Sequence, residues 1–151
     1  MKPARSALAA AALATIMLSP TPLAAQADAQ IAQAFERGRN SGTTPLTRGE
    51  KTMCAGYWGS WAEMIVDPPA DEVLAQLPRE LLPQVAFGIS KGWNANRLAD
   101  GASETDLEEA IEVAFEDFIT AMAVQDVDAS MRYFETLGSC LPPPGESGKE
   151  A

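Results

Sequence analysis

The chain has 151 residues, with 21 acids against 11 Lys and Arg, two cysteines and no histidine. The missing histidine excludes Ser-His-Asp and Cys-His catalysis and the usual zinc sites, so any catalysis would have to use carboxylates, Lys, Tyr or Ser. The net charge of −10 argues against nucleic acid and against anionic membrane surfaces, because both are bound by basic side chains.

The first 27 residues are typical of a secretory signal peptide. Lys2 and Arg5 precede an apolar run over residues 7–18, and the small residues of Ala25-Gln26-Ala27 form a cleavage site. The run is shorter than the roughly 20 residues that span a bilayer. We therefore expect a bacterial periplasmic or secreted protein whose mature chain does not insert into the membrane; the alternative is an uncleaved anchor.

Cleavage after Ala27 defines the mature chain. It removes 27 of the 151 residues and two of the 11 cations. The remaining 124 residues carry nine cations and 21 acids, a net charge of −12. A chain of this length is expected to form one domain with one core. We place that domain at residues 28–141 and predict a disordered polar tail at 142–151.

Two helices are expected between residue 28 and the proline pair Pro68-Pro69. Residues 28–39 predict a short peripheral helix. Thr47 and Glu50 have the spacing of a capping box, which starts the second helix. Apolar residues then recur at helical spacing up to Ile65, and Gly56 and Gly59 indicate that another backbone packs closely against this helix.

Three further helical segments follow in the sequence. Residues 69–77 predict one short helix, and a second runs from Pro78 to the stop at Asp100-Gly101. Residues 103–122 predict the clearest helix, with a broad apolar face that includes Phe115 and Ile119 and an acidic opposite face. Residues 129–137 resume a helix that Gly138 would end. Because no segment alternates like a strand, the expected fold is an all-α bundle of four to five helices.

The two cysteines, Cys54 and Cys140, are expected to pair. An even number of cysteines in an exported chain implies a disulfide, and no C-x-x-C motif favours a redox role. The bond would join the second helix to the end of the last one and close a loop of about 86 residues, which on the loop-entropy model stabilises by about 4 to 5 kcal/mol.

Four aromatic residues are candidate binding residues. Trp and Tyr are enriched at binding hot spots, but an aromatic stripe at helical spacing also forms a core. Neighbouring helix positions lie about 100° apart, so either Tyr57 or Trp58 is expected at the edge of the core or at a groove. The four are Tyr57, Trp58, Trp61 and Trp93.

The acids of the long helix form the second candidate binding surface. Glu109, Glu112 and Glu116 are spaced so that they lie on one side of the helix, where like charges repel. They form either a solvated face or the contact surface for a basic protein partner. A carboxylate metal site is the third alternative for these acids, and Asp126-x-Asp128 lacks the ligand set and the glycine of a calcium loop. We expect neither a metal nor a cofactor.

A four-residue segment resembles a known family. Cys54-Ala55-Gly56-Tyr57 is similar to the C-x-G-Y segment of the Tai family, small helical periplasmic immunity proteins that neutralise peptidoglycan amidase effectors of type VI secretion. The resemblance implies that Cys54 is half of a disulfide and that Tyr57 packs or makes contact with the partner.

The sequence therefore predicts a non-catalytic exported binding protein, with an inhibitor or immunity-type protein as one form of it. One alternative is a small-ligand binder with a pocket lined by the tryptophans. The other is a hydrolase that uses two carboxylates, as glycosidases do. The oligomeric state stays open.

Overall fold

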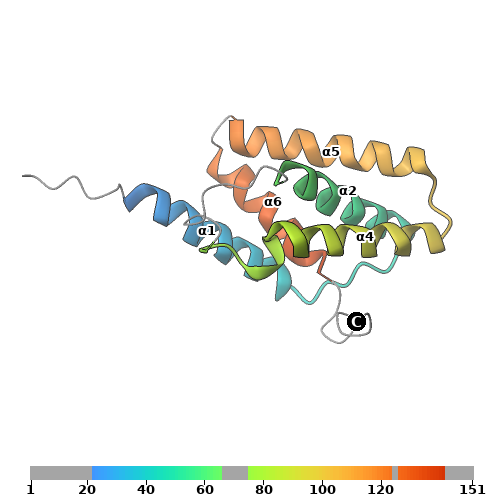
Figure 1. The fold of residues 1–151 in the computed structure, drawn as a ribbon, viewed down its shortest axis with the longest axis horizontal. Coiled ribbons are helices and arrows are strands. Elements are labelled where there is room, and N and C mark those ends of the chain that lie inside the picture. Colours follow the sequence, from blue (N-terminus) through green and yellow to red (C-terminus); the bar gives the residue numbers. More distant parts are fainter. Residues whose placement is uncertain (1–21, 66–74, 124–125, 142–151) are drawn as a thin grey trace, which may run out of the picture.

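The computed structural model describes residues 22–65, 75–123 and 126–141, which form five α-helices, one 3-10 turn and no strand. The elements are α1 (Pro22–Arg39), α2 (Arg48–Met64), η1 (Arg79–Leu81), α4 (Pro83–Ala99), α5 (Glu104–Ala123) and α6 (Val127–Ser139), as Figure 1 shows. The expected all-α bundle is thereby confirmed. Most of the predicted signal peptide (1–21), most of the predicted helix at 69–77 and the predicted tail at 142–151 lie outside the described residues.

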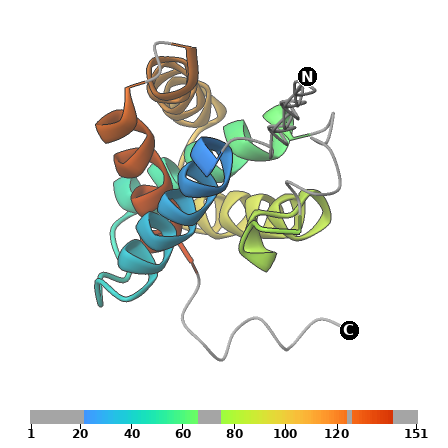
Figure 2. The same cartoon turned by 90° about the vertical axis from the view of Figure 1, so that its left-hand side faces the viewer.

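Helix α2 lies at the centre of the bundle. It packs against α4 on one side and α5 on the other, while α6 packs against both α1 and α5. Figure 1 shows α5 along the upper edge of the molecule, and Figure 2 shows α1 and α6 side by side. Among the helices that the structure describes, we find none both long and apolar enough to cross a membrane.

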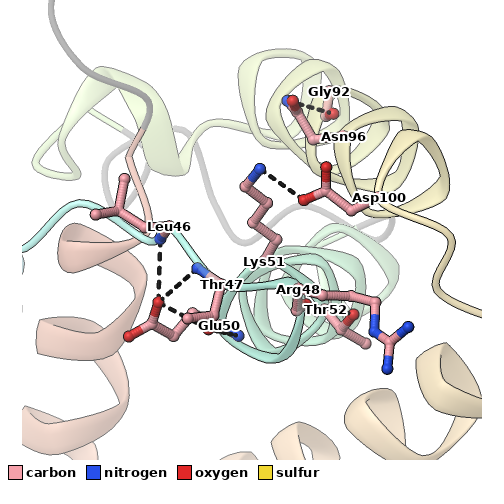
Figure 3. Close-up of polar contacts among 9 residues, drawn as sticks. All are labelled: Leu46, Thr47, Arg48, Glu50, Lys51, Thr52, Gly92, Asn96 and Asp100. Carbon is pink, nitrogen blue, oxygen red and sulfur yellow. Dashed lines mark hydrogen bonds and ion pairs between the residues drawn. The ribbon is translucent and has the colours of Figure 1, made fainter.

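The predicted capping box of α2 is confirmed. The Thr47 side chain accepts a hydrogen bond from the Glu50 amide at 3.2 Å, and Glu50 Oε2 accepts from the amides of Thr47 and Leu46 at 2.9 and 3.0 Å (Figure 3). The bonds that the Glu50 carboxylate accepts, first of all the one from the Thr47 amide, lower the pKa of Glu50 from its ordinary value because they stabilise the carboxylate. Local side-chain chemistry therefore sets where this helix begins.

Two of the other helix starts follow the same rule. Ser103 and Asp106 exchange reciprocal side-chain to amide bonds at the start of α5, and the Asp126 carboxylate accepts from the Ala129 amide at the start of α6. Helix α4 starts later than predicted, at Pro83 instead of Pro78, because the segment between them forms η1. Proline fits this first helical position because its missing N–H would have no partner there.

The first helix corrects an expectation. It begins at Pro22, before the predicted cleavage site, and it is not peripheral, since Phe35 is fully buried. Gly138 does not end α6 but lies inside it: a Cβ there would stand 2.0 Å from the Phe35 carbonyl oxygen, and one on Gly38 would stand 1.9 Å from the Glu135 carbonyl oxygen. The two glycines let the backbones of α1 and α6 touch.

The two glycines of α2 differ in their surroundings. A Cβ on Gly56 would lie 2.5 Å from the Ala110 carbonyl oxygen of α5, whereas one on Gly59 would make only ordinary contacts, the nearest at 3.7 Å to Ile111. The predicted close approach is confirmed at Gly56 and wrong at Gly59.

A matched pair of substitutions tests this difference. Gly56→Ala is expected to reduce the free energy of unfolding by about 1 to 3 kcal/mol, because α5 would have to move away. Gly59→Ala is expected to be neutral or to add up to about 1 kcal/mol, since alanine favours a helix over glycine. Denaturant unfolding measures both, and equal losses in the two variants would contradict the account.

The predicted disulfide is present. Cys54 of α2 and Cys140 at the end of α6 are bonded, with their Cα atoms 5.3 Å apart, and both side chains are fully buried. The bond joins the central helix to the last described turn of the chain.

Candidate functional site

The three tryptophans among the candidates are core residues. Trp58 and Trp93 both donate their indole N–H to the carbonyl oxygen of Cys140, at 3.2 and 2.6 Å, and Trp61 donates to the Leu81 carbonyl oxygen at 3.1 Å. All three side chains are buried. Because their rings pack inside the bundle and their only polar atoms are satisfied there, they hold α4, α6 and η1 against α2.

Tyr57 is the candidate that reaches a hollow. It lies on the flank of α2, about 100° around the helix from Trp58, and its hydroxyl donates to the Asp117 carboxylate of α5. Its ring lies 5.4 Å from that of Tyr133, centroid to centroid. Tyr57 lines two hollows, which matches the prediction that either Tyr57 or Trp58 would lie at the edge of the core or at a groove.

The hollow toward α6, which we call the α6 hollow, has a volume of about 230 Å³. It carries one acid from α5 and one base from α6, together with hydroxyl groups. Neither charge forms an ion pair with a described side chain. Its polar lining consists of Tyr57, Asp117, Thr120, Arg132, Tyr133 and Thr136.

The hollow toward the start of α2, which we call the α2 hollow, is larger, at about 430 Å³. Met53 and Val113 form its exposed apolar part, and Arg48, Asp106 and Glu109 stand around it. Figure 3 shows the Arg48 and Lys51 side chains extending in different directions, and Lys51 reaches Asp100, the residue that follows α4, at 2.6 Å.

The two tyrosines stay protonated far above neutral pH. Burial raises the pKa of Tyr57 well above its ordinary value, and the adjoining Asp117 carboxylate raises it further by hydrogen bond and by charge. Burial likewise raises the pKa of Tyr133. At neutral pH both hydroxyls therefore donate or accept hydrogen bonds as neutral groups.

A titration tests these environments, because the chain contains only two tyrosines. An unfolded chain loses its phenol protons near pH 10 and the folded chain does not, so stability is complete below about pH 10 and falls as the pH rises above it. We expect phenolate absorbance to appear only together with loss of helical circular dichroism. Phenolate formation near pH 10 in a folded chain would contradict the account, and Asp117→Asn should lower the pKa of Tyr57.

The outward side of α5 carries the predicted acids. Glu109, Glu112 and Glu116 are exposed, and no ion pair to them occurs among the described residues. The same helix contains further acids but neither Lys nor Arg. The predicted apolar face of α5 is wrong at two positions, since Phe115 is 44% exposed and Ile119 is 40% exposed. We call Glu108, Glu109, Glu112, Phe115, Glu116 and Ile119 the outer face of α5.

Sequence reasoning missed part of this surface. Asp117, Arg132 and Tyr133 line the α6 hollow, and Val113 lines the α2 hollow, but none was a candidate. The helical spacing of Asp106, Val113 and Asp117 would have shown that they share a flank of α5. It would not have shown that α2 and α6 leave that flank open. No group of three potential metal ligands is found among the residues with described positions.

Two residues of the Cys54-Ala55-Gly56-Tyr57 segment can be compared with what its resemblance implies. Cys54 is disulfide-bonded, and Tyr57 packs in the bundle and lines the hollows. No family model matches the chain, and neither a curated protein nor a solved structure was found that matches it.

Proposed function

We propose that this chain is an exported, non-catalytic binding protein whose outer face of α5 binds a basic surface of a partner protein. The observation that carries the proposal is the exposure of Phe115 and Ile119 among Glu108, Glu112 and Glu116. A surface of this kind offers apolar area for burial and negative charge for steering and orientation.

The energetics of α5 support a partner. Glu112 lies four residues from both Glu108 and Glu116, and like charges at this spacing destabilise a helix by a few tenths of a kcal/mol per pair. Solvent screens this repulsion, but basic side chains of a partner would reverse it. Binding would then recover free energy that the isolated helix lacks.

The scaffold suits a binding role. The disulfide joins α2 to the end of α6, and the acids at the outer face project from a helix that packs on both of these elements. A surface on a cross-linked bundle loses little conformational entropy on association. Export rests on the signal-peptide pattern of the first 27 residues, and the oxidised cysteines suit an extracytoplasmic compartment. An inhibitor or immunity-type protein is one form of this proposal.

A crosslinking pull-down from the native cell envelope tests the proposal. Mature protein is compared with a Glu109→Gln, Glu112→Gln, Glu116→Gln variant. Because neutralisation removes the repulsion within α5, the variant should be at least as stable as the wild type, so lost binding cannot come from unfolding. A partner captured by the wild type and lost by the variant supports the proposal.

The control variant neutralises three acids elsewhere on the bundle, Glu36, Glu63 and Asp128. It changes the net charge by the same amount, so it should keep the partner if the outer face of α5 makes the contact. Equal capture by all three proteins, or equal loss in both variants, would contradict a specific role of this face.

A further inference from the structure

We propose that the α6 hollow binds a small zwitterion, with its carboxylate on Arg132 and its ammonium group on Asp117. The α6 hollow is a different surface from the outer face of α5, so binding there does not depend on a protein partner. The hollow has a volume of about 230 Å³, which is less than the roughly 300 Å³ or more of sites for drug-sized ligands. The part of a ligand that the hollow can hold is therefore of the size of a single amino acid.

The charges that line the hollow select the ligand class. Among the described residues, Asp117 and Arg132 are the only charged ones that line the hollow; both are exposed at its rim, they carry opposite charges, and they do not form an ion pair with each other. A simple anion would pair with Arg132 but be repelled by the Asp117 carboxylate. A simple cation would pair with Asp117 but be repelled by the Arg132 guanidinium. A zwitterion satisfies both, and guanidinium binds a carboxylate through two parallel hydrogen bonds.

The neutral groups around the two charges fit the same ligand. The hydroxyl of Tyr57 donates to Asp117 and so orients the carboxylate from within the bundle. Tyr133 is held by a 2.9 Å hydrogen bond to Ser60, so its ring forms a fixed part of the wall. Thr120 adds a hydroxyl group that can donate or accept, whereas the Thr136 hydroxyl donates to the Arg132 carbonyl oxygen at 2.9 Å and can only accept from a ligand. The walls come from α2, α5 and α6, which the disulfide and helix packing hold in place.

The test is an NMR titration of the folded protein with three compounds of nearly the same size. L-Alanine carries both charges, propionate lacks the ammonium group and ethylammonium lacks the carboxylate. We expect saturable shifts of the Tyr57, Thr120 and Arg132 amides with L-alanine, and affinity at least about tenfold lower for the other two, since each loses one charge-assisted contact.

Variants locate the site. Asp117→Asn keeps an oxygen that accepts the Tyr57 hydroxyl, so the fold should survive, and it and Arg132→Gln should each weaken L-alanine binding at least about tenfold. Glu116→Gln and Arg48→Gln, which change the same charges outside the hollow, should not. Absence of saturable binding, equal binding of propionate, or unchanged affinity in the Asp117 and Arg132 variants would overturn the proposal. Each outcome is independent of the envelope pull-down.

Discussion

Removing the disulfide is expected to lower the free energy of unfolding by about 4 to 5 kcal/mol, because the bond closes a loop between residues 86 positions apart. For a chain of this size the loss corresponds to a fall in Tm of roughly 10 to 20 °C. The variant Cys54→Ala with Cys140→Ala is the suitable one, since it leaves neither a free thiol nor a buried hydroxyl.

Reductant provides the control for this prediction. Wild type reduced in denaturant and refolded under reducing conditions should reach the stability of the double variant, and reductant should not change the double variant itself. The wild type needs denaturant because both sulfurs are fully buried. Equal Tm values for oxidised wild type and the double variant would show that the bond adds no stability.

Trp58→Ala is expected to cost about 3 to 5 kcal/mol, which is the range for deleting a large buried aromatic side chain. The Trp58 ring is fully buried, lies edge-on to Phe35 of α1 at 6.3 Å, and donates to the Cys140 carbonyl oxygen. The substitution therefore removes contacts among α1, α2 and α6 together. Denaturant unfolding measures the loss.

A conservative substitution separates packing from hydrogen bonding at the same site. Trp58→Phe keeps most of the apolar volume, and the Cys140 carbonyl oxygen keeps its bond from Trp93, so less than half of the loss is expected. If Trp58→Ala lost under about 1 kcal/mol, Trp58 would not be the packing centre that its burial indicates.

The sequence predicted the features that depend on nearby residues. Thr47 with Glu50 and Ser103 with the following turn mark helix starts because a side chain there meets an unpaired backbone N–H. The cysteine pair was also predictable, since two cysteines allow only one pairing. These features need no knowledge of which helices touch.

The features that the sequence did not predict depend on helix packing. Gly138 lies where α1 crosses α6, and a glycine near a helix end looks the same whether it ends the helix or lets a neighbour approach. The apolar stripe of α5 is wider than its contacts with α2 and α6, so Phe115 and Ile119 remain exposed. The α6 hollow forms from three helices at once, and no local pattern contains it.

Site-specific photocrosslinking in the native envelope tests most directly whether the outer face of α5 meets a partner. A photoreactive amino acid replaces Glu112 or Glu116 of α5 or, as the control, exposed Ala95 of α4. We expect one discrete adduct from positions 112 and 116 and none from position 95. An adduct from position 95 alone, the same adducts from all three, or none from any of them would contradict this expectation.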